Sequence, residues 1–99
     1  MNLIQTNIKD CYLLQPQVFE DDRGYFMETY NKKVFQQHTG LRVDFVQDNE
    51  SMSNYGVIRG LHTQSGCYAQ AKLIKVAQGK VLDVVVDARK DSPTYGEKY

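Results

Sequence analysis

The sequence predicts a mainly β protein with one short helix, and three observations support this class. Short apolar stretches recur along residues 1–99, and turn residues such as Gly, Asn and Asp separate them. Several stretches alternate apolar with polar side chains, which is typical of strands with one buried face. Helical spacing of apolar residues occurs only in residues 31–40. A chain this short buries a small core, so a partner subunit or a further segment is expected to extend it.

The first predicted strands lie in the N-terminal third of the chain. The stretch "CYLLQPQVF" contains two apolar runs, and Pro16 interrupts them because it cannot donate a backbone hydrogen bond. In the next stretch, "GYFMETY", successive side chains point to opposite faces, so Phe26 and Glu28 share one face.

The predicted helix occupies "NKKVFQQHTG", residues 31–40. Asn31 can cap its N-terminus, Val34 and Phe35 give it an apolar stripe, and Gly40 suits the left-handed conformation that ends many helices. In the stretch that follows, "VDFVQDN", period-two alternation places Gln47 and Asn49 on one face.

Three further strands are predicted in the second half, at 57–63, 69–76 and 80–87. Turns are expected at Ser65-Gly66 and Gln78-Gly79 between them. The last strand has one face with only apolar side chains, which is expected to pack inward against a second sheet; this face comprises Leu82, Val84 and Val86. After it, "DSPTYG" contains turn residues, so another strand is expected to begin near the end of the sequence.

Composition excludes several functional classes. Twelve basic residues balance twelve acidic ones without a long basic run, so neither a nucleic acid nor an anionic membrane is an expected partner. No apolar run approaches the roughly 20 residues of a membrane helix. Cys11 and Cys67 have no CxxC spacing, and the N-terminus does not resemble a signal peptide, which favours a reduced, cytoplasmic protein.

His62 is the main candidate for chemistry, and three interpretations compete. Metal-binding barrels often use two histidines one residue apart, but His62 is followed by Thr and Gln, and His38 lies in the predicted helix; we therefore expect no metal. His62 is alternatively a general base, with Lys72 stabilising the resulting anion and Asp83 orienting the imidazole. The third interpretation is that His62 is structural and Asp83 a solvated strand residue.

Two arginines are candidates for binding an anion. Arg23 and Arg59 each precede a glycine, and a guanidinium beside a glycine can approach a phosphate or diphosphate closely. The alternative for Arg23 is an ion pair with Asp21 or Asp22 in a turn.

In the functional interpretation, the remaining candidate residues would surround a bound nucleotide. Phe26 can stack on a base, Glu28 can enter a pocket, and Gln47 and Asn49 can bind a base edge through hydrogen bonds. The alternatives are a core aromatic for Phe26, a cross-strand lysine partner for Glu28, and buried backbone partners for the two amides.

Several segments, taken together and in order, resemble the dTDP-4-dehydrorhamnose 3,5-epimerase family, a branch of the cupin-type barrels. The resemblance extends from about Phe19 to the end of the sequence. The segments that carry it are "FEDDRGYFMETYN", "VQDNESMSNYGVIRGLHTQ", "AQAKLIKVAQGKVLDVVVDAR" and "DSPTYG".

The resemblance implies a cupin-like jelly-roll subunit without metal or other cofactor, which forms a homodimer by exchanging strands. Its substrate would be a dTDP-linked 4-keto-6-deoxy sugar on the route to dTDP-L-rhamnose. By this likeness, His62 removes the protons next to the ketone and Lys72 stabilises the enolate oxygen. The implied substrate contacts are Arg23, Phe26, Glu28, Gln47, Asn49 and Arg59.

The sequence also departs from the family. Members are close to twice as long, and their second half supplies a tyrosine acid, a carboxylate that supports the base and the strands that close the barrel. Residues 1–99 are therefore expected to form a single domain that is the N-terminal part of such a jelly roll. Tyr95 and Tyr99 do not match the acid-tyrosine motif, and "SGCYAQ" replaces a usually shorter connection.

Three functions follow from this interpretation. The favoured function is 3,5-epimerisation of dTDP-4-keto-6-deoxyglucose, because the base, the enolate partner and both arginines are present. A related sugar-nucleotide 3,4-ketoisomerase would use the same base but deliver the proton elsewhere. A non-catalytic remnant would bind nucleotide or dimerise without proton exchange.

Overall fold

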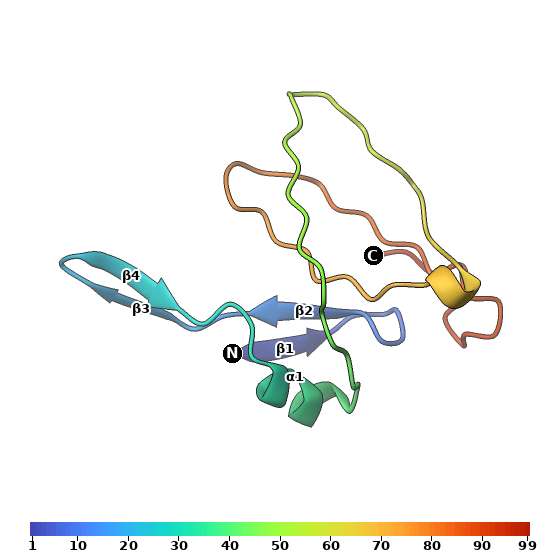
Figure 1. Cartoon of the computed structure of the whole chain (residues 1–99), viewed down its shortest axis with the longest axis horizontal. Helices are drawn as coiled ribbons and strands as arrows, with labels where there is room; N and C mark the ends of the chain where they lie inside the picture. Colours follow the sequence, from blue (N-terminus) through green and yellow to red (C-terminus); the bar gives the residue numbers. More distant parts are fainter.

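The computed structural model describes residues 1–99 and contains two β-hairpins, one helix and a long, mostly irregular second half. The strands pair only within each hairpin, β1 with β2 and β3 with β4, and both pairs are antiparallel (Figure 1). The elements are β1 (Asn2–Gln5), β2 (Tyr12–Gln15), β3 (Val18–Asp21), β4 (Gly24–Met27), α1 (Lys32–Thr39) and the 3₁₀ turn η1 (Gly66–Tyr68).

The break predicted at Pro16 is confirmed. Strand β2 ends at Gln15 and β3 begins at Val18, so Pro16 lies between two hairpins, where no strand needs its missing N–H. In the second hairpin, Phe19 pairs with Phe26, which places the two aromatic rings across from each other.

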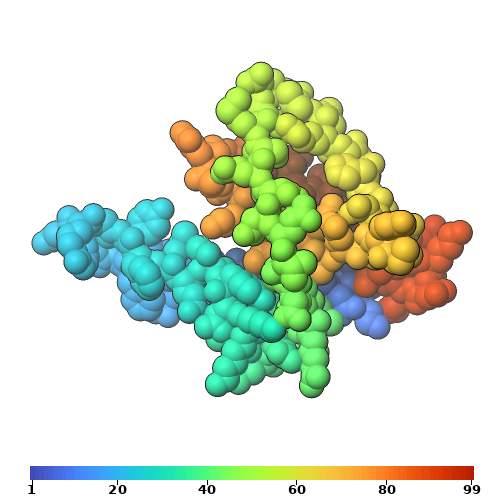
Figure 2. All heavy atoms as spheres, in the orientation of Figure 1, coloured from blue at the N-terminus to red at the C-terminus, as the bar shows by residue number.

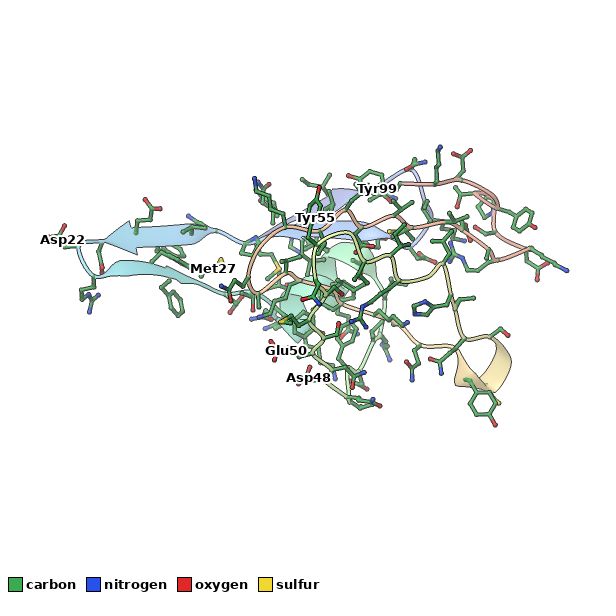
Figure 3. All side chains as sticks on the ribbon, turned by 90° about the horizontal axis from the view of Figure 1, so that it is seen from above. Asp22, Met27, Asp48, Glu50, Tyr55 and Tyr99 are labelled. Carbon is green, nitrogen blue, oxygen red and sulfur yellow. The ribbon has the colours of Figure 1, made fainter.

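The β3–β4 hairpin projects from the rest of the molecule as an arm (Figures 1 and 2). Asp22 lies at its tip and Met27 at its root (Figure 3). Both faces of the arm are exposed, and Phe19 and Phe26 keep 55% and 71% of their surface accessible. Apolar side chains in such an arrangement are typical of a surface that another polypeptide covers.

The helix forms at the predicted place with the predicted caps. The Asn31 side-chain oxygen accepts a hydrogen bond from the Val34 N–H at 3.1 Å. Gly40 ends the helix with φ of 72°, and its N–H donates to the Gln36 carbonyl at 2.9 Å. A residue with a Cβ would be strained in this conformation, which is why glycine is favoured there.

A small aromatic cluster joins α1 to the segments before and after it. Phe35 is buried, and its ring lies 6.0 Å from Tyr30 and 6.4 Å from Phe45. Tyr30 and Phe45 meet edge to face at 5.3 Å. Such tilted arrangements place the positive edge of one ring against the negative face of another, which stabilises the packing.

The three strands predicted in the second half are not formed as regular strands in this chain. Residues 57–63, 69–76 and 80–84 make no ladder, and the only β-bridge there joins Val86 to Lys98. A strand is stable only when a neighbour accepts and donates its backbone hydrogen bonds, and within these 99 residues no neighbour is present. The turn expected at Ser65-Gly66 leads directly into η1.

The turn predicted in "DSPTYG" is confirmed, and the chain resumes pairing after it. The Tyr95 N–H donates to the Ser92 carbonyl at 3.1 Å, and the Gly96 N–H donates to the Asp87 carbonyl at 2.8 Å. Val85 and Tyr99 then exchange two backbone hydrogen bonds, at 3.0 and 2.9 Å, as antiparallel neighbours do.

Little of the chain is buried. Only Ile8, Phe35 and Asp87 are shielded from solvent. The face of Leu82, Val84 and Val86 was expected to pack against a second sheet, and this is wrong for the isolated chain, because Leu82 is 92% exposed. The radius of gyration is 15.5 Å, whereas a compact domain of about 100 residues has about 13 Å.

Candidate functional site

His62 lies in an exposed segment, and the backbone before it leaves room for its ring. Gly60 has φ of 99°, and a Cβ at this position would lie 3.1 Å from the His62 Nδ1 atom. The backbone conformation favours glycine here, and a Cβ would in addition press the imidazole out of its present position. His62 makes no hydrogen bond to another residue of the chain.

The structure does not bring the predicted base and its helpers into contact. Lys72 and Asp83 are both exposed, and neither forms a hydrogen bond or an ion pair within the chain. The predicted roles needed their strands to lie side by side, and those strands are unpaired here. The interactions among His62, Lys72 and Asp83 therefore stay a prediction.

Arg59 is held in place by the loop that precedes it. Its Nε donates to the Ser53 hydroxyl and its Nη2 to the Met52 carbonyl, both at 2.8 Å. These two bonds orient the guanidinium but leave Nη1 without a partner in the chain. An arginine fixed on one side and open on the other is suited to bind an anion.

Arg23 forms the ion pair that was its alternative interpretation. Its Nη2 lies 2.6 Å from the Asp21 carboxylate, and its backbone N–H donates to the same carboxylate at 2.8 Å. The Arg23 side chain holds the pKa of Asp21 below its usual value. Both side chains are exposed at the tip of the arm, so this pair contributes little to stability.

Phe26 and Glu28 lie on one face, as predicted. Together with Met1, Gln17 and Phe19 they line a shallow pocket of about 290 Å³ at the root of the arm. The Glu28 carboxylate accepts a hydrogen bond from the Asn31 side chain at 3.3 Å. No lysine of the chain pairs with Glu28.

Gln47 and Asn49 also share a face. The Gln47 Nε2 donates to the Asn49 Oδ1 at 3.1 Å, and both side chains are exposed. The side-chain oxygen of Gln47 and the side-chain nitrogen of Asn49 form no hydrogen bond within the chain. An acceptor and a donor side by side can bind the edge of a nucleobase.

Nothing in the structure suggests a set of metal ligands. No three His, Cys, Asp or Glu side chains gather at one point. His38 lies in α1, where its Nδ1 is 2.8 Å from the Val34 carbonyl oxygen of its own helix.

The sequence reasoning missed a polar cluster around one buried carboxylate, which we name the Asp87 clamp and define as Asp87, Arg89, Ser92 and Thr94. The Asp87 side chain is fully shielded and accepts hydrogen bonds from three side chains. The Arg89 Nε lies at 2.9 Å, and the Ser92 and Thr94 hydroxyls lie at 2.6 Å. These donors hold the pKa of Asp87 far below its ordinary range, with Arg89 the largest cause.

The clamp also binds the loop between β1 and β2. The Arg89 Nη2 donates to the Lys9 carbonyl at 2.6 Å, and the Thr94 hydroxyl accepts from the Lys9 N–H at 3.0 Å. The sequence signal was an aspartate followed two residues later by arginine and five and seven residues later by hydroxyl side chains. An Asp at the start of a turn commonly bonds the groups that follow it.

Comparison with known proteins identifies the family. Residues 5–99 match the sequence profile of the dTDP-4-dehydrorhamnose 3,5-epimerase family. The chain belongs to this family. An epimerase from Shigella flexneri is 54% identical over 97 residues, and one from Methanothermobacter thermautotrophicus is 53% identical over 94 residues.

Solved epimerase structures match the shape of the chain. The crystal structure of an epimerase from Elizabethkingia anophelis superposes with a TM-score of 0.95 at 56% identity, over 100% of this chain and 54% of that one. An epimerase from Bacillus anthracis, crystallised with TDP and PPi, gives 0.90 at 52% identity and covers 99% and 56%. This confirms the predicted fold class, a jelly roll of which the chain forms a part.

The relatives are longer than this chain. The match with the Shigella flexneri epimerase includes 98% of this chain but 54% of that relative. It therefore spans about half the length of the curated relatives it matches. Neither α1 nor η1 has the length and hydrophobicity of a membrane-spanning helix.

Proposed function

We propose that residues 1–99 form the N-terminal part of an epimerase jelly roll that acts on dTDP-4-keto-6-deoxyglucose. One observation carries the proposal: all of this chain superposes on 54% of a solved 3,5-epimerase, with a TM-score of 0.95 and 56% identity. This identity supports carrying the activity over from the relatives, which a likeness of fold alone would not.

In this proposal His62 is the base. The C4 ketone acidifies the hydrogens on C3 and C5, and the imidazole removes each in turn. The Lys72 ammonium stabilises the negative charge that develops on the ketone oxygen. Reprotonation on the opposite face of the sugar inverts each centre. Because His62 forms no hydrogen bond in the chain, its ring nitrogens are available to a substrate.

The arginines and the polar pair bind the nucleotide in this proposal. Arg59 contacts the diphosphate, since its guanidinium is oriented by the preceding loop and open on one side. Gln47 and Asn49 contact the nucleotide or the sugar through their two free polar atoms. The TDP and PPi in the Bacillus anthracis epimerase support a site for these groups.

The arm supplies the remaining contacts from a second copy of the chain. Arg23, Phe26 and Glu28 lie on or beside the arm, whereas the segment 57–65 that carries His62 leads into η1 at the opposite end of the molecule (Figure 1). A site that uses both sets requires an arm from a partner subunit. We therefore propose a homodimer that exchanges arms, without nucleic-acid or membrane partners.

The proposed location is the cytoplasm. Cys11 and Cys67 are free thiols, as expected in a reducing compartment.

A non-catalytic binding remnant is the second candidate. It is favoured by the isolated exposure of His62 and Lys72, which no residue of this chain orients. Such a protein would bind thymidine diphosphate without exchanging substrate protons.

Proton NMR in heavy water separates the two candidates. The chain is incubated with dTDP-4-keto-6-deoxyglucose, and the C3 and C5 proton signals are followed. The proposal expects both signals to disappear with the wild-type chain and with His38→Ala, which removes the histidine outside the site. It expects no loss with His62→Ala. Persistence of the signals in a folded wild-type sample, with TDP still binding, would establish the remnant instead.

A further inference from the structure

A tight turn over residues 54–57 brings Arg59 back beside the segment that precedes it. The Val57 N–H donates to the Asn54 carbonyl at 3.2 Å, so the chain reverses its direction there. Gly56 is the third residue of the turn and has φ of 84°, a conformation that glycine adopts without strain. The reversal explains how the Arg59 side chain reaches residues six and seven positions earlier.

The contacts of Arg59 use one edge of its guanidinium and leave the other edge free. Nε donates to the Ser53 hydroxyl oxygen and Nη2 donates to the Met52 carbonyl, both at 2.8 Å. A guanidinium has five N–H donors in a fixed planar fork, so three of them have no partner in the chain. The free donors are the two on Nη1 and the second one on Nη2. These two nitrogens can bind two oxygens of a phosphate group side by side.

The partners of Arg59 differ in charge from the partner of Arg23. Asp21 accepts from Nε and Nη2 of Arg23, so its carboxylate balances the charge of that guanidinium. A hydroxyl and a backbone carbonyl carry no charge, and the ion pairs of the chain do not include Arg59. Arg59 therefore keeps its positive charge for an anionic ligand while its orientation is fixed.

Only one of the two contacts depends on a side chain. Met52 accepts through its backbone carbonyl, which any residue at this position would supply, whereas Ser53 accepts through its hydroxyl. Ser53 and Arg59 are both exposed, so without this bond water would compete for Nε and the guanidinium would gain freedom to rotate. Ordering such a side chain during binding costs roughly two- to tenfold in affinity.

We infer that Ser53 is a positioning residue for diphosphate binding. Its hydroxyl holds the guanidinium of Arg59 with the free edge available to the ligand, and it acts through Arg59 rather than by touching the ligand. This role rests on the proposed contact between Arg59 and the diphosphate, and it adds the residue that prepares that contact. Nothing in it depends on proton removal from the sugar.

NMR titration of the 99-residue chain with TDP, and with thymidine, which lacks the phosphates, tests this role. Ser53→Ala should weaken TDP binding about fivefold, because Arg59 must then be ordered during binding, and should leave the thymidine affinity unchanged. Ser53→Thr keeps a hydroxyl and should restore the TDP affinity. Ser51→Ala is the matched control, since it removes from the same loop an exposed hydroxyl that makes no hydrogen bond in the chain.

A double-mutant cycle with Arg59→Ala separates positioning from direct contact. If Ser53 acts through Arg59, adding Ser53→Ala to Arg59→Ala should change the TDP affinity by less than about twofold. The unliganded chain provides a second measurement. The Arg59 Nε–H proton should exchange with water about threefold faster in Ser53→Ala than in the wild-type chain, because it loses its acceptor.

Three results would overturn the role of Ser53. One is an unchanged TDP affinity in Ser53→Ala. Another is an equal loss of TDP and thymidine affinity, which would show a general effect on the loop. The third is a further loss of about fivefold in the Arg59→Ala background, which would mean that the hydroxyl contacts the ligand itself.

The same titration distinguishes this role from the proposed activity. TDP binding that depends on Ser53, in a chain that exchanges no substrate protons, would refute the epimerisation and leave the role of Ser53 standing. Proton exchange by a chain whose TDP affinity ignores Ser53→Ala would do the reverse. A folded wild-type chain that binds no TDP would overturn both.

Discussion

Asp87 and Arg89 form an ion pair two residues apart, with the guanidinium Nε 2.9 Å from one carboxylate oxygen and Nη2 3.0 Å from the other. The carboxylate is fully shielded, whereas the Arg89 side chain is half exposed and also reaches the Lys9 carbonyl. The pair therefore joins the turn near the C-terminus to the loop between β1 and β2. Two regions about 80 residues apart in the sequence are thus connected.

Replacing Asp87 should open this connection. Asp87→Asn removes the charge that Arg89 neutralises, and the half-buried hydroxyls of Ser92 and Thr94 lose a strong acceptor. We expect the Val85 and Tyr99 amides to exchange roughly tenfold faster or more, because about this factor corresponds to the loss of one such bond. Hydrogen exchange measures it. Asp91→Asn is the control, since Asp91 is exposed and unbonded, and an equal effect of both variants would contradict the role of the clamp.

The clamp should be insensitive to pH across the neutral range. The pKa of Asp87 is lowered in the folded chain, so its contribution to stability is fully present above the ordinary value of 3.8 and declines as the pH falls below it. We expect exchange at Val85 and Tyr99 to be constant between about pH 5 and 8, after correction for the intrinsic rate, and to rise below about pH 4. A rise near pH 6 would show that another group controls the contact.

Gly60 should be essential for the orientation of His62. Gly60→Ala would introduce a Cβ 3.1 Å from Nδ1 at a φ of 99°, so either the ring or the backbone must shift. We expect a large change in the His62 NMR signals and loss of proton exchange of at least tenfold. Gly79→Ala is the matched control, because Gly79 also has a positive φ but has no atoms near its missing Cβ. It should leave the His62 signals unchanged.

Asn31 should stabilise the start of α1. Asn31→Ala removes the acceptor for the Val34 N–H and is expected to cost about 1 kcal/mol of helix stability. Circular dichroism during urea unfolding would record it. Asn31→Asp keeps an oxygen at this position and adds a charge that favours a helix N-terminus, so it should restore the helix. Equal loss with both variants would assign the effect to the Glu28 contact instead.

Local signals determined the elements that the sequence predicted correctly. Pro16 separates two hairpins because it lacks an N–H. Asn31 begins the helix because its side chain accepts a backbone hydrogen bond, and Gly40 ends it because glycine readily adopts the left-handed conformation. Period-two alternation likewise placed Gln47 beside Asn49. These features depend on residues within a few positions of one another, so the sequence alone specifies them.

Features that depend on distant residues were decided by the tertiary structure. The segments at 57–63, 69–76 and 80–87 have strand-like sequences, yet a strand needs a hydrogen-bonded neighbour, and the sequence does not reveal whether one is available. The Asp87 clamp contacts Lys9 and Asp10, about 80 positions away in the sequence, and no local pattern indicates this contact.

The sequence by itself determined the family, the local turns and caps, and the identity of the candidate site residues. Only the tertiary structure showed that Arg23 pairs with Asp21 at the tip of an arm, away from the segment that carries His62. The physical reason is the distance along the sequence between the interacting residues. The hydrogen bonds of caps and turns form within a few neighbouring residues, whereas a site built from separate strands forms only when the folded chain and its partners bring those strands together.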